Sequence, residues 1–194
     1  MRIAIAVFDG TEELDWAGPW EVLAAWAKNW PEDGVEVFTV TDSRDPVTCA
    51  KGLRVLADRT WDDAGRFDVL IYPGGRGVRP QLGVDRVRER IRGLAGAGTL
   101  MTSVCTGALA YADAGLLDHR AATTHWSALD DLAELGTGID VRPDARFVDC
   151  GDVITAAGVS AGIDMALHLV ARLHSEQRAR EVRREIQYDP EPPV

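Results

Sequence analysis

Short apolar segments alternate with helix-forming segments along most of the chain, and this alternation limits the possible folds more than any other feature. Residues 19–30 illustrate a helical segment, because Leu23, Trp26, Ala27 and Trp30 follow i, i+3, i+4, i+7 spacing. Strands and helices alternate at least four times. Because strands separated by helices are joined by crossover connections, the pattern predicts an α/β fold, a three-layer sandwich in which helices cover both faces of a mostly parallel sheet.

The expected elements follow from apolar periodicity and from turn residues. The expected strands are residues 2–8, 35–40, 68–75 and about 99–104, with one or two short strands within 53–61. The FDGTEELDWAGP segment is expected to be a loop. The expected helices are residues 19–30, 81–96, about 105–114, 160–174 and 175–187, of which 160–174 is apolar nearly all round and so expected to be buried. We also expect a short strand over 122–126, a helix ending near Leu135, and a hairpin over 145–158.

Length, charge and cysteine content narrow the class of protein. A length of 194 residues suits a single domain over residues 1–194. The formal net charge of −10 argues against nucleic acid or an anionic membrane as the main partner. No uninterrupted apolar segment approaches a membrane span, and the N-terminal apolar run is too short for a signal peptide, so we expect a cytoplasmic location. Cys49, Cys105 and Cys150 are widely spaced without a CxxC motif, so we expect neither a disulfide framework nor a metal site.

Residues 99–112, TLMTSVCTGALAYA, begin as a β-prone run and end as an alanine-rich helix former. A strand that turns at once into a helix at small residues exposes one side chain at the turn, as in a nucleophile elbow. The pattern Ser103-x-Cys105-x-Gly107 puts a thiol there. Unpaired N–H groups at the start of the helix are expected to favour the Cys105 thiolate. A cysteine in an apolar run can equally be an inert buried residue, so its role depends on its surroundings.

Other chemically capable residues follow neighbouring expected strands. Asp15 comes after the first strand, Gly74 and Gly75 end the fourth, and Cys105 follows the fifth. Because sites in parallel sheets lie at the carboxyl ends of the strands, we expect these residues to meet at one edge. The N–H groups of Gly75 and Thr106 are candidate donors to an oxyanion, and the two glycines allow close approach of the backbone.

Three further side chains are candidates for this site. Asp15 is preferred over the glutamates beside it because its apolar neighbours would raise the pKa of its carboxyl group. His125 is the histidine at a plausible strand end, and both a pocket-lining role and a role as a base remain open. Trp16 and Trp126 are candidates for an apolar pocket, with structural packing as the alternative.

Several motifs together resemble the PfpI superfamily, the class I glutamine-amidotransferase-like group that includes the Parkinsonism-associated protein and intracellular proteases. They are GTEELDWAGPWEVL, YPGG, SVCTGALAYADAGLL, ATTHW, GVSAGIDMALHLV and the terminal QYDPEPP, and the resemblance covers about residues 2–193. The combination of Asp15 with Cys-Thr-Gly, ATTHW and YDP is most similar to isocyanide (isonitrile) hydratases. The same motifs occur in the ligand-binding half of AraC-type regulators.

The resemblance implies a flavodoxin-like fold, a homodimer with the site near its interface, and Cys105 as nucleophile with Asp15 and Thr106 beside it. It implies conversion of a small-molecule isonitrile to an N-formamide through a thioimidate on Cys105, without a cofactor. Protease-like members carry histidine directly after the cysteine, whereas this chain has Thr106, which counts against peptidase activity. Two alternatives stay open: a non-enzymatic small-molecule or redox sensor related to the regulators, and another thiol-based activity such as an amidase or glyoxalase.

Overall fold

The computed structural model describes residues 1–191. The last three residues of the expected domain over 1–194, and with them the end of the QYDPEPP motif, lie outside the described residues. At its centre is a seven-stranded sheet in the order β10-β11-β7-β6-β1-β2-β5. Neighbouring strands run parallel except β10 and β11, which form an antiparallel hairpin at one edge. The strands are β1 (Arg2–Ala6), β2 (Glu36–Thr41), β5 (Arg59–Thr60), β6 (Val69–Tyr72), β7 (Leu100–Val104), β10 (Phe147–Asp149) and β11 (Val153–Ala156).

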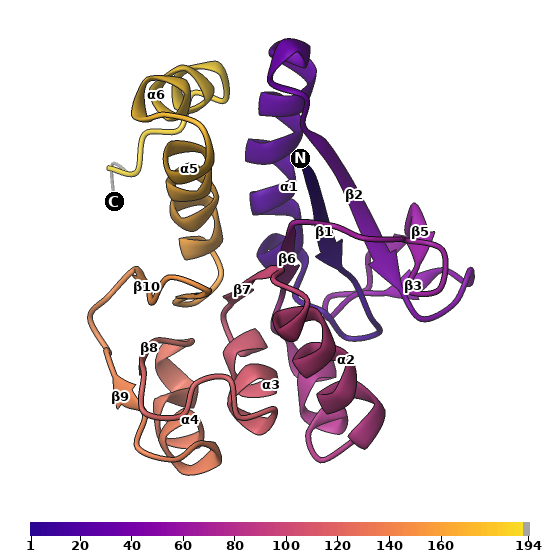
Figure 1. Cartoon of the computed structure of the whole chain (residues 1–194), viewed down its shortest axis with the longest axis vertical. Coiled ribbons are helices and arrows are strands. Elements are labelled where there is room, and N and C mark those ends of the chain that lie inside the picture. The colour runs from indigo at the N-terminus through magenta and orange to yellow at the C-terminus, as the bar shows by residue number, and fades with distance from the viewer. Residues whose placement is uncertain (192–194) are drawn as a thin grey trace.

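Helices cover both faces of the sheet, so the predicted three-layer α/β sandwich is confirmed. They are α1 (Glu13–Asn29), α2 (Asp85–Gly96), α3 (Gly107–Asp113), α4 (Leu129–Leu135), α5 (Ala161–Leu173) and α6 (Glu176–Glu185). Figure 1 shows α1, α5 and α6 gathered on one side of the sheet and α2, α3 and α4 on the other. The buried apolar side chains form one cluster under each group, with Leu23, Trp26 and Leu169 in the first and Ile91, Leu109 and Leu132 in the second.

Short elements complete the chain. Between residues 1 and 191, 3-10 helices cover Pro31–Asp33, Arg76–Gln81 and Trp126–Ala128. Strands β3 (Val47–Thr48) and β4 (Arg54–Val55) form a small antiparallel pair, and β8 (Ala121–Ala122) and β9 (Asp140–Val141) form a parallel one. In residues 1–191, no helix has the length and apolar character needed to cross a membrane.

The largest departure from the expected elements is the start of the first helix. Helix α1 begins at Glu13, so Asp15 and Trp16 lie in a helix and not in the expected loop. Pro19 is the first residue of the expected helix 19–30, a position where its missing N–H is harmless. Pro19 instead lies inside α1, where its ring packs so closely against Gly162 of α5 that a Cβ at that glycine would lie 3.1 Å from Pro19 Cγ.

Two other expectations need correction. Helix α5 is buried on one face only, because Asp164 and His168 are half-buried and Arg172 is exposed. These side chains bond to Tyr188, in the segment after α6, or to Asp149 of β10. Of the expected strand over 122–126, only Ala122 lies in a strand, β8, and a 3-10 helix begins at Trp126. Residues 53–61 contain two separate two-residue strands, β4 and β5, which agrees with the expectation of one or two short strands there.

Candidate functional site

Cys105 lies at the turn between β7 and α3 and has the backbone conformation of a nucleophile elbow. Its φ is +56°, in the left-handed region that a residue with a side chain rarely adopts. The Cys105 N–H donates to the carbonyl oxygens of Ala156 and Ala157 at 3.1 and 3.0 Å, which ties the turn to the end of β11. The side chain is 6% exposed. The turn is therefore the sharp strand-to-helix connection that the Ser-x-Cys-x-Gly pattern predicted.

Gly107 allows this turn to pack against the end of β6. A Cβ at Gly107 would lie 2.2 Å from the Tyr72 carbonyl oxygen, closer than any side chain tolerates. The register of the sheet brings the two segments together, because Tyr72 of β6 pairs with Ser103 of β7. The carboxyl ends of β6 and β7 consequently meet at one edge.

Asp15, in the first turn of α1, is fully buried beside this elbow. Its Oδ2 atom accepts a hydrogen bond from the Gly74 N–H at 2.9 Å. Its Oδ1 atom has no hydrogen-bond partner within residues 1–191, and the Cys105 thiol is close enough to lower the pKa of the carboxyl group. Burial raises the pKa of Asp15 from 3.8 to about 7, although the Gly74 amide and the Cys105 thiol favour the carboxylate.

The same surroundings keep the Cys105 thiol protonated. Burial and the charge of Asp15 raise the pKa of Cys105 to about 12, against the opposing effect of the Thr106 and Val159 N–H groups, which lowers it. The expected thiolate is therefore not the resting form. Helix α3 has only seven residues, and its N-terminal field is outweighed by desolvation and by the neighbouring carboxyl group.

Gly74 and Gly75 connect Asp15 to Thr106. A Cβ at Gly74 would lie 2.5 Å from the Thr106 nitrogen, and a Cβ at Gly75, where φ is +105°, would lie 2.4 Å from the Glu12 nitrogen. The Gly75 N–H donates to Thr106 Oγ1 at 3.0 Å. This N–H, which we expected to serve an oxyanion, is thus already used to orient the threonine side chain, whereas the Thr106 N–H points at the sulfur.

His125 lies close to the elbow but makes its hydrogen bonds elsewhere. The preceding Thr124 donates through Oγ1 to the Cys105 carbonyl oxygen at 2.7 Å. The His125 ring packs on Gly158, where a Cβ would lie 2.4 Å from His125 Cδ2. His125 Nδ1 accepts from the Ser127 N–H at 3.3 Å. Among the described residues no hydrogen bond joins His125 to the thiol, and the connection to the elbow runs through Thr124.

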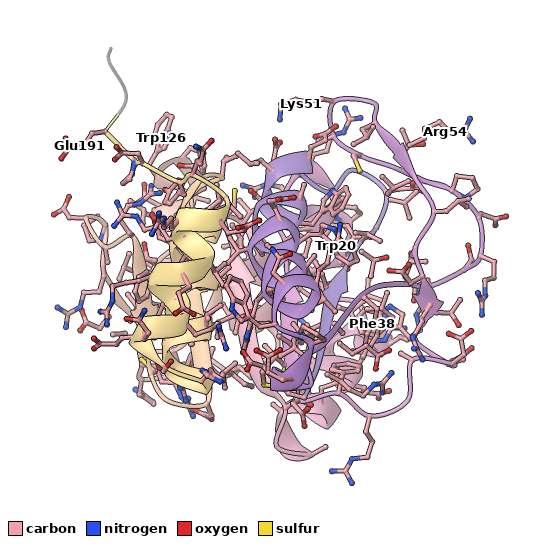
Figure 2. All side chains as sticks on the ribbon, turned by 90° about the horizontal axis from the view of Figure 1, so that it is seen from above. Trp20, Phe38, Lys51, Arg54, Trp126 and Glu191 are labelled. Atoms are coloured by element: carbon pink, nitrogen blue, oxygen red, sulfur yellow. The ribbon has the colours of Figure 1, made fainter. Side chains whose placement is uncertain are left out.

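The two candidate tryptophans lie in different places. Trp16 lines a cavity of about 310 Å³ together with Trp20 and Leu56, and Cys105 is not among the residues that line it. Trp126 is 77% exposed, and Figure 2 shows it projecting from the rim of the molecule. Its ring lies 5.4 Å from that of His125. Trp126 therefore neighbours His125, whereas Trp16 follows Asp15 in α1 and packs against the apolar cluster that includes Cys105.

Val159 is a site residue that the sequence did not reveal. Its φ is +46°, which is rarer for a β-branched residue than for cysteine, and its N–H lowers the pKa of the Cys105 thiol. In the sequence Val159 belongs to the GVSAGIDMALHLV motif, but nothing in that motif indicates its backbone conformation. Among the described residues, no group of three His, Cys, Asp or Glu side chains is arranged to hold a metal ion.

Comparison with known proteins gives one consistent family. The sequence model described as the DJ-1/PfpI family matches residues 1–172. An isonitrile hydratase of Pseudomonas putida is 37% identical over 193 residues, which cover 100% of this chain and 81% of that protein. The HTH-type transcriptional regulator CdhR of Pseudomonas aeruginosa is 35% identical over 141 residues, 71% of this chain but 40% of the regulator. The crystal structure of a ThiJ/PfpI family protein from Pseudomonas syringae has a TM-score of 0.88 and 33% identity, and the match covers 100% of this chain and 77% of that one.

Proposed function

The chain belongs to the DJ-1/PfpI family, and on that basis we propose that it is a cysteine-dependent hydratase that converts isonitriles to N-formamides. The observation that carries the proposal is the pairing of the Cys105 thiol with the buried Asp15 carboxyl group, whose pKa is raised to about 7. A thiol held against a carboxyl group that titrates near neutral pH is suited to proton transfer in both directions. The 37% identity to an isonitrile hydratase supports the choice of substrate.

The proposed reaction starts from the protonated thiol. Asp15, as carboxylate, accepts the thiol proton while the Cys105 sulfur attacks the terminal carbon of the isonitrile. The same proton is then delivered from Asp15 to that carbon, which gives a thioimidate in which the carbon is bonded to sulfur, hydrogen and nitrogen. The sulfur and the proton of the thiol both become bonded to the terminal carbon, and the total charge does not change.

Hydrolysis of the thioimidate completes the cycle. Water adds to the C=N carbon, and its proton is transferred to the nitrogen with Asp15 as the relay. The tetrahedral intermediate collapses, the C–S bond breaks, and the sulfur regains a proton as the N-formamide leaves. One isonitrile and one water are consumed for each formamide. The Thr106 and Val159 N–H groups stabilise negative charge on the sulfur at both steps.

The test is turnover of an aryl and an alkyl isonitrile by the purified protein, followed as formamide by chromatography. Cys105→Ala should abolish turnover, and Asp15→Asn should lower kcat by about two to four orders of magnitude, as expected for a lost proton-transfer group. Cys150→Ala is the matched control, because Cys150 is a free cysteine whose Sγ donates to the Ala121 carbonyl oxygen, far along the chain from the elbow. Formamide production no greater than that of Cys105→Ala would reject the proposal.

A second candidate function rests on the similarity to CdhR, of which this chain matches 40%. A small-molecule or redox sensor would bind or react through Cys105 without turnover. Reversible oxidation of Cys105 by dilute peroxide, seen by mass spectrometry, combined with no isonitrile turnover, would favour a sensor. A glyoxalase or amidase activity would be recognised by faster turnover of methylglyoxal or small amides than of isonitriles.

A further inference from the structure

The Val159 N–H lowers the pKa of the Cys105 thiol, and Val159 follows closely after Ala157, whose carbonyl oxygen accepts from the Cys105 N–H at 3.0 Å. The φ of Val159 is +46°, a conformation that the chain does not adopt without support. Backbone strain of this kind persists only where the surrounding structure holds it. Val159 directly precedes the Ser160 N-cap of α5, and its carbonyl oxygen accepts from the Gly162 N–H at 3.4 Å. The position of the Val159 N–H is therefore coupled to the first turn of α5.

Asp164 anchors that first turn. Its Oδ2 atom accepts from Arg146 Nε at 2.7 Å, and the two side chains form an ion pair. Arg146 also donates through Nη2 to Ser160 Oγ at 3.2 Å, and its carbonyl oxygen accepts from the Ala157 N–H at 2.9 Å. Arg146 thus contacts the chain on both sides of Val159.

Tyr188, in the segment that follows α6, completes this group. Its hydroxyl donates to Asp164 Oδ1 at 2.9 Å. Gln187, with φ of +49°, turns the chain after α6, and Arg183 Nε donates to the Tyr188 carbonyl oxygen at 3.0 Å. Burial and the neighbouring Asp164 raise the pKa of Tyr188, so its hydroxyl remains protonated and can donate. The YDP motif is placed next to the segment that contacts the nucleophile, although it is more than 80 residues from Cys105 in the sequence.

We propose that Tyr188 is a positioning residue for Cys105: acting through Asp164 and Arg146, its hydroxyl holds the Val159 N–H against the nucleophilic sulfur. The proposal rests on the proposed function only in taking Cys105 as the reacting group. The titratable side chain that faces Cys105 is Asp15, which comes from α1. The charges of Glu12 and Lys51 act in turn on the Asp15 carboxyl group. Substitution of Tyr188 leaves these groups in place.

The test is the rate at which iodoacetamide alkylates Cys105 in the full chain, measured by mass spectrometry across neutral and alkaline pH. Tyr188→Phe removes one hydroxyl and should slow the alkylation of Cys105 about three- to tenfold at fixed pH, which corresponds to an upward shift of its pH profile by about half a unit to one unit. Asp164→Asn, which removes the ion pair with Arg146, should act in the same direction. Alkylation of Cys150 in the same sample is the internal reference.

Asp149→Asn is the matched control, because Asp149 holds the other end of α5. It accepts hydrogen bonds from His168 Nε2 at 2.7 Å and from Arg172 Nη1 at 2.9 Å. This variant should leave the Cys105 profile unchanged. An unshifted profile in Tyr188→Phe would overturn the proposal, and so would an equal shift in Asp149→Asn, since that would show a general loosening of α5. Iodoacetamide reacts whether or not isonitriles are substrates, so a wild-type protein without hydratase activity would reject the proposed function alone.

Discussion

Replacing Asp15 with asparagine should change the stability of the protein by an amount that depends on pH. The pKa of the Asp15 carboxyl is raised from 3.8 to about 7, so the folded state binds this proton more tightly than the unfolded state. The stabilisation that the Asp15 carboxyl gives the wild type is therefore fully present below about pH 4, falls as pH rises to about 7, and is lost above that. At about 1.4 kcal/mol for each unit of pKa, the whole loss is about 4 kcal/mol.

Asparagine keeps an oxygen that can accept from the Gly74 N–H and has no proton to lose in this range. The free energy of unfolding of Asp15→Asn, relative to wild type, should thus rise by about 4 kcal/mol between about pH 4 and pH 8. Urea unfolding at both pH values measures it, and other titrations cancel in the difference. A change below about 1 kcal/mol would refute the reasoning, because the carboxyl would then not be desolvated in the folded state.

Asp149→Asn provides a control of opposite sign. Burial alone would raise the pKa of Asp149, but hydrogen bonds from His168 and the Gly151 N–H, with the charge of Arg172, hold it below its ordinary value. The stabilisation by this carboxylate is present above its unfolded pKa and is lost as pH falls through its folded pKa. The variant should therefore be closest to wild type at acid pH and less stable than wild type at neutral pH.

Three further outcomes follow from the same site. Cys105→Gly should be more stable than Cys105→Ala by about 1 kcal/mol in urea unfolding, because alanine must keep the φ of +56° that glycine adopts freely. Gly74→Ala should lower the melting temperature and remove turnover, since its Cβ would lie 2.5 Å from the Thr106 nitrogen. If Asp15 takes the thiol proton as a carboxylate, kcat/KM for an isonitrile should rise with pH through about 7 and then level off, and a profile that falls over this range would contradict that role.

The fold could be predicted from the sequence because the signals that define its strands and helices lie within single short segments. The alternation of apolar runs with helical spacing defines the strands and helices, and short crossover connections then allow few sheet arrangements. The error at α1 has a specific cause: Pro19 indicates a helix start by local rules, whereas its contact with Gly162 depends on how α1 and α5 pack. Tertiary packing of this kind has no signal in a single segment.

The proximity of Asp15, Gly74 and Cys105 was predictable from the sequence, whereas the electrostatics of these groups were not. The strand order brings Asp15, Gly74 and Cys105 together at one edge, which the sequence indicated. The protonation of Cys105 depends on how completely it and Asp15 are removed from water, and the N–H of Val159 reaches the sulfur only because of a backbone conformation. Neither property follows from residue types or spacing.

These electrostatics also bear on the choice between an enzyme and a redox sensor. Sensor cysteines react as thiolates, and they are typically accessible and have a lowered pKa. Cys105 is 6% exposed, and its pKa is raised to about 12 by burial and by Asp15. Such a thiol reacts poorly with dilute oxidant, but it reacts with a bound substrate when a neighbouring carboxylate can take its proton. Asp15, with a pKa of about 7, is suited to that proton transfer, so the arrangement favours catalysis over oxidation.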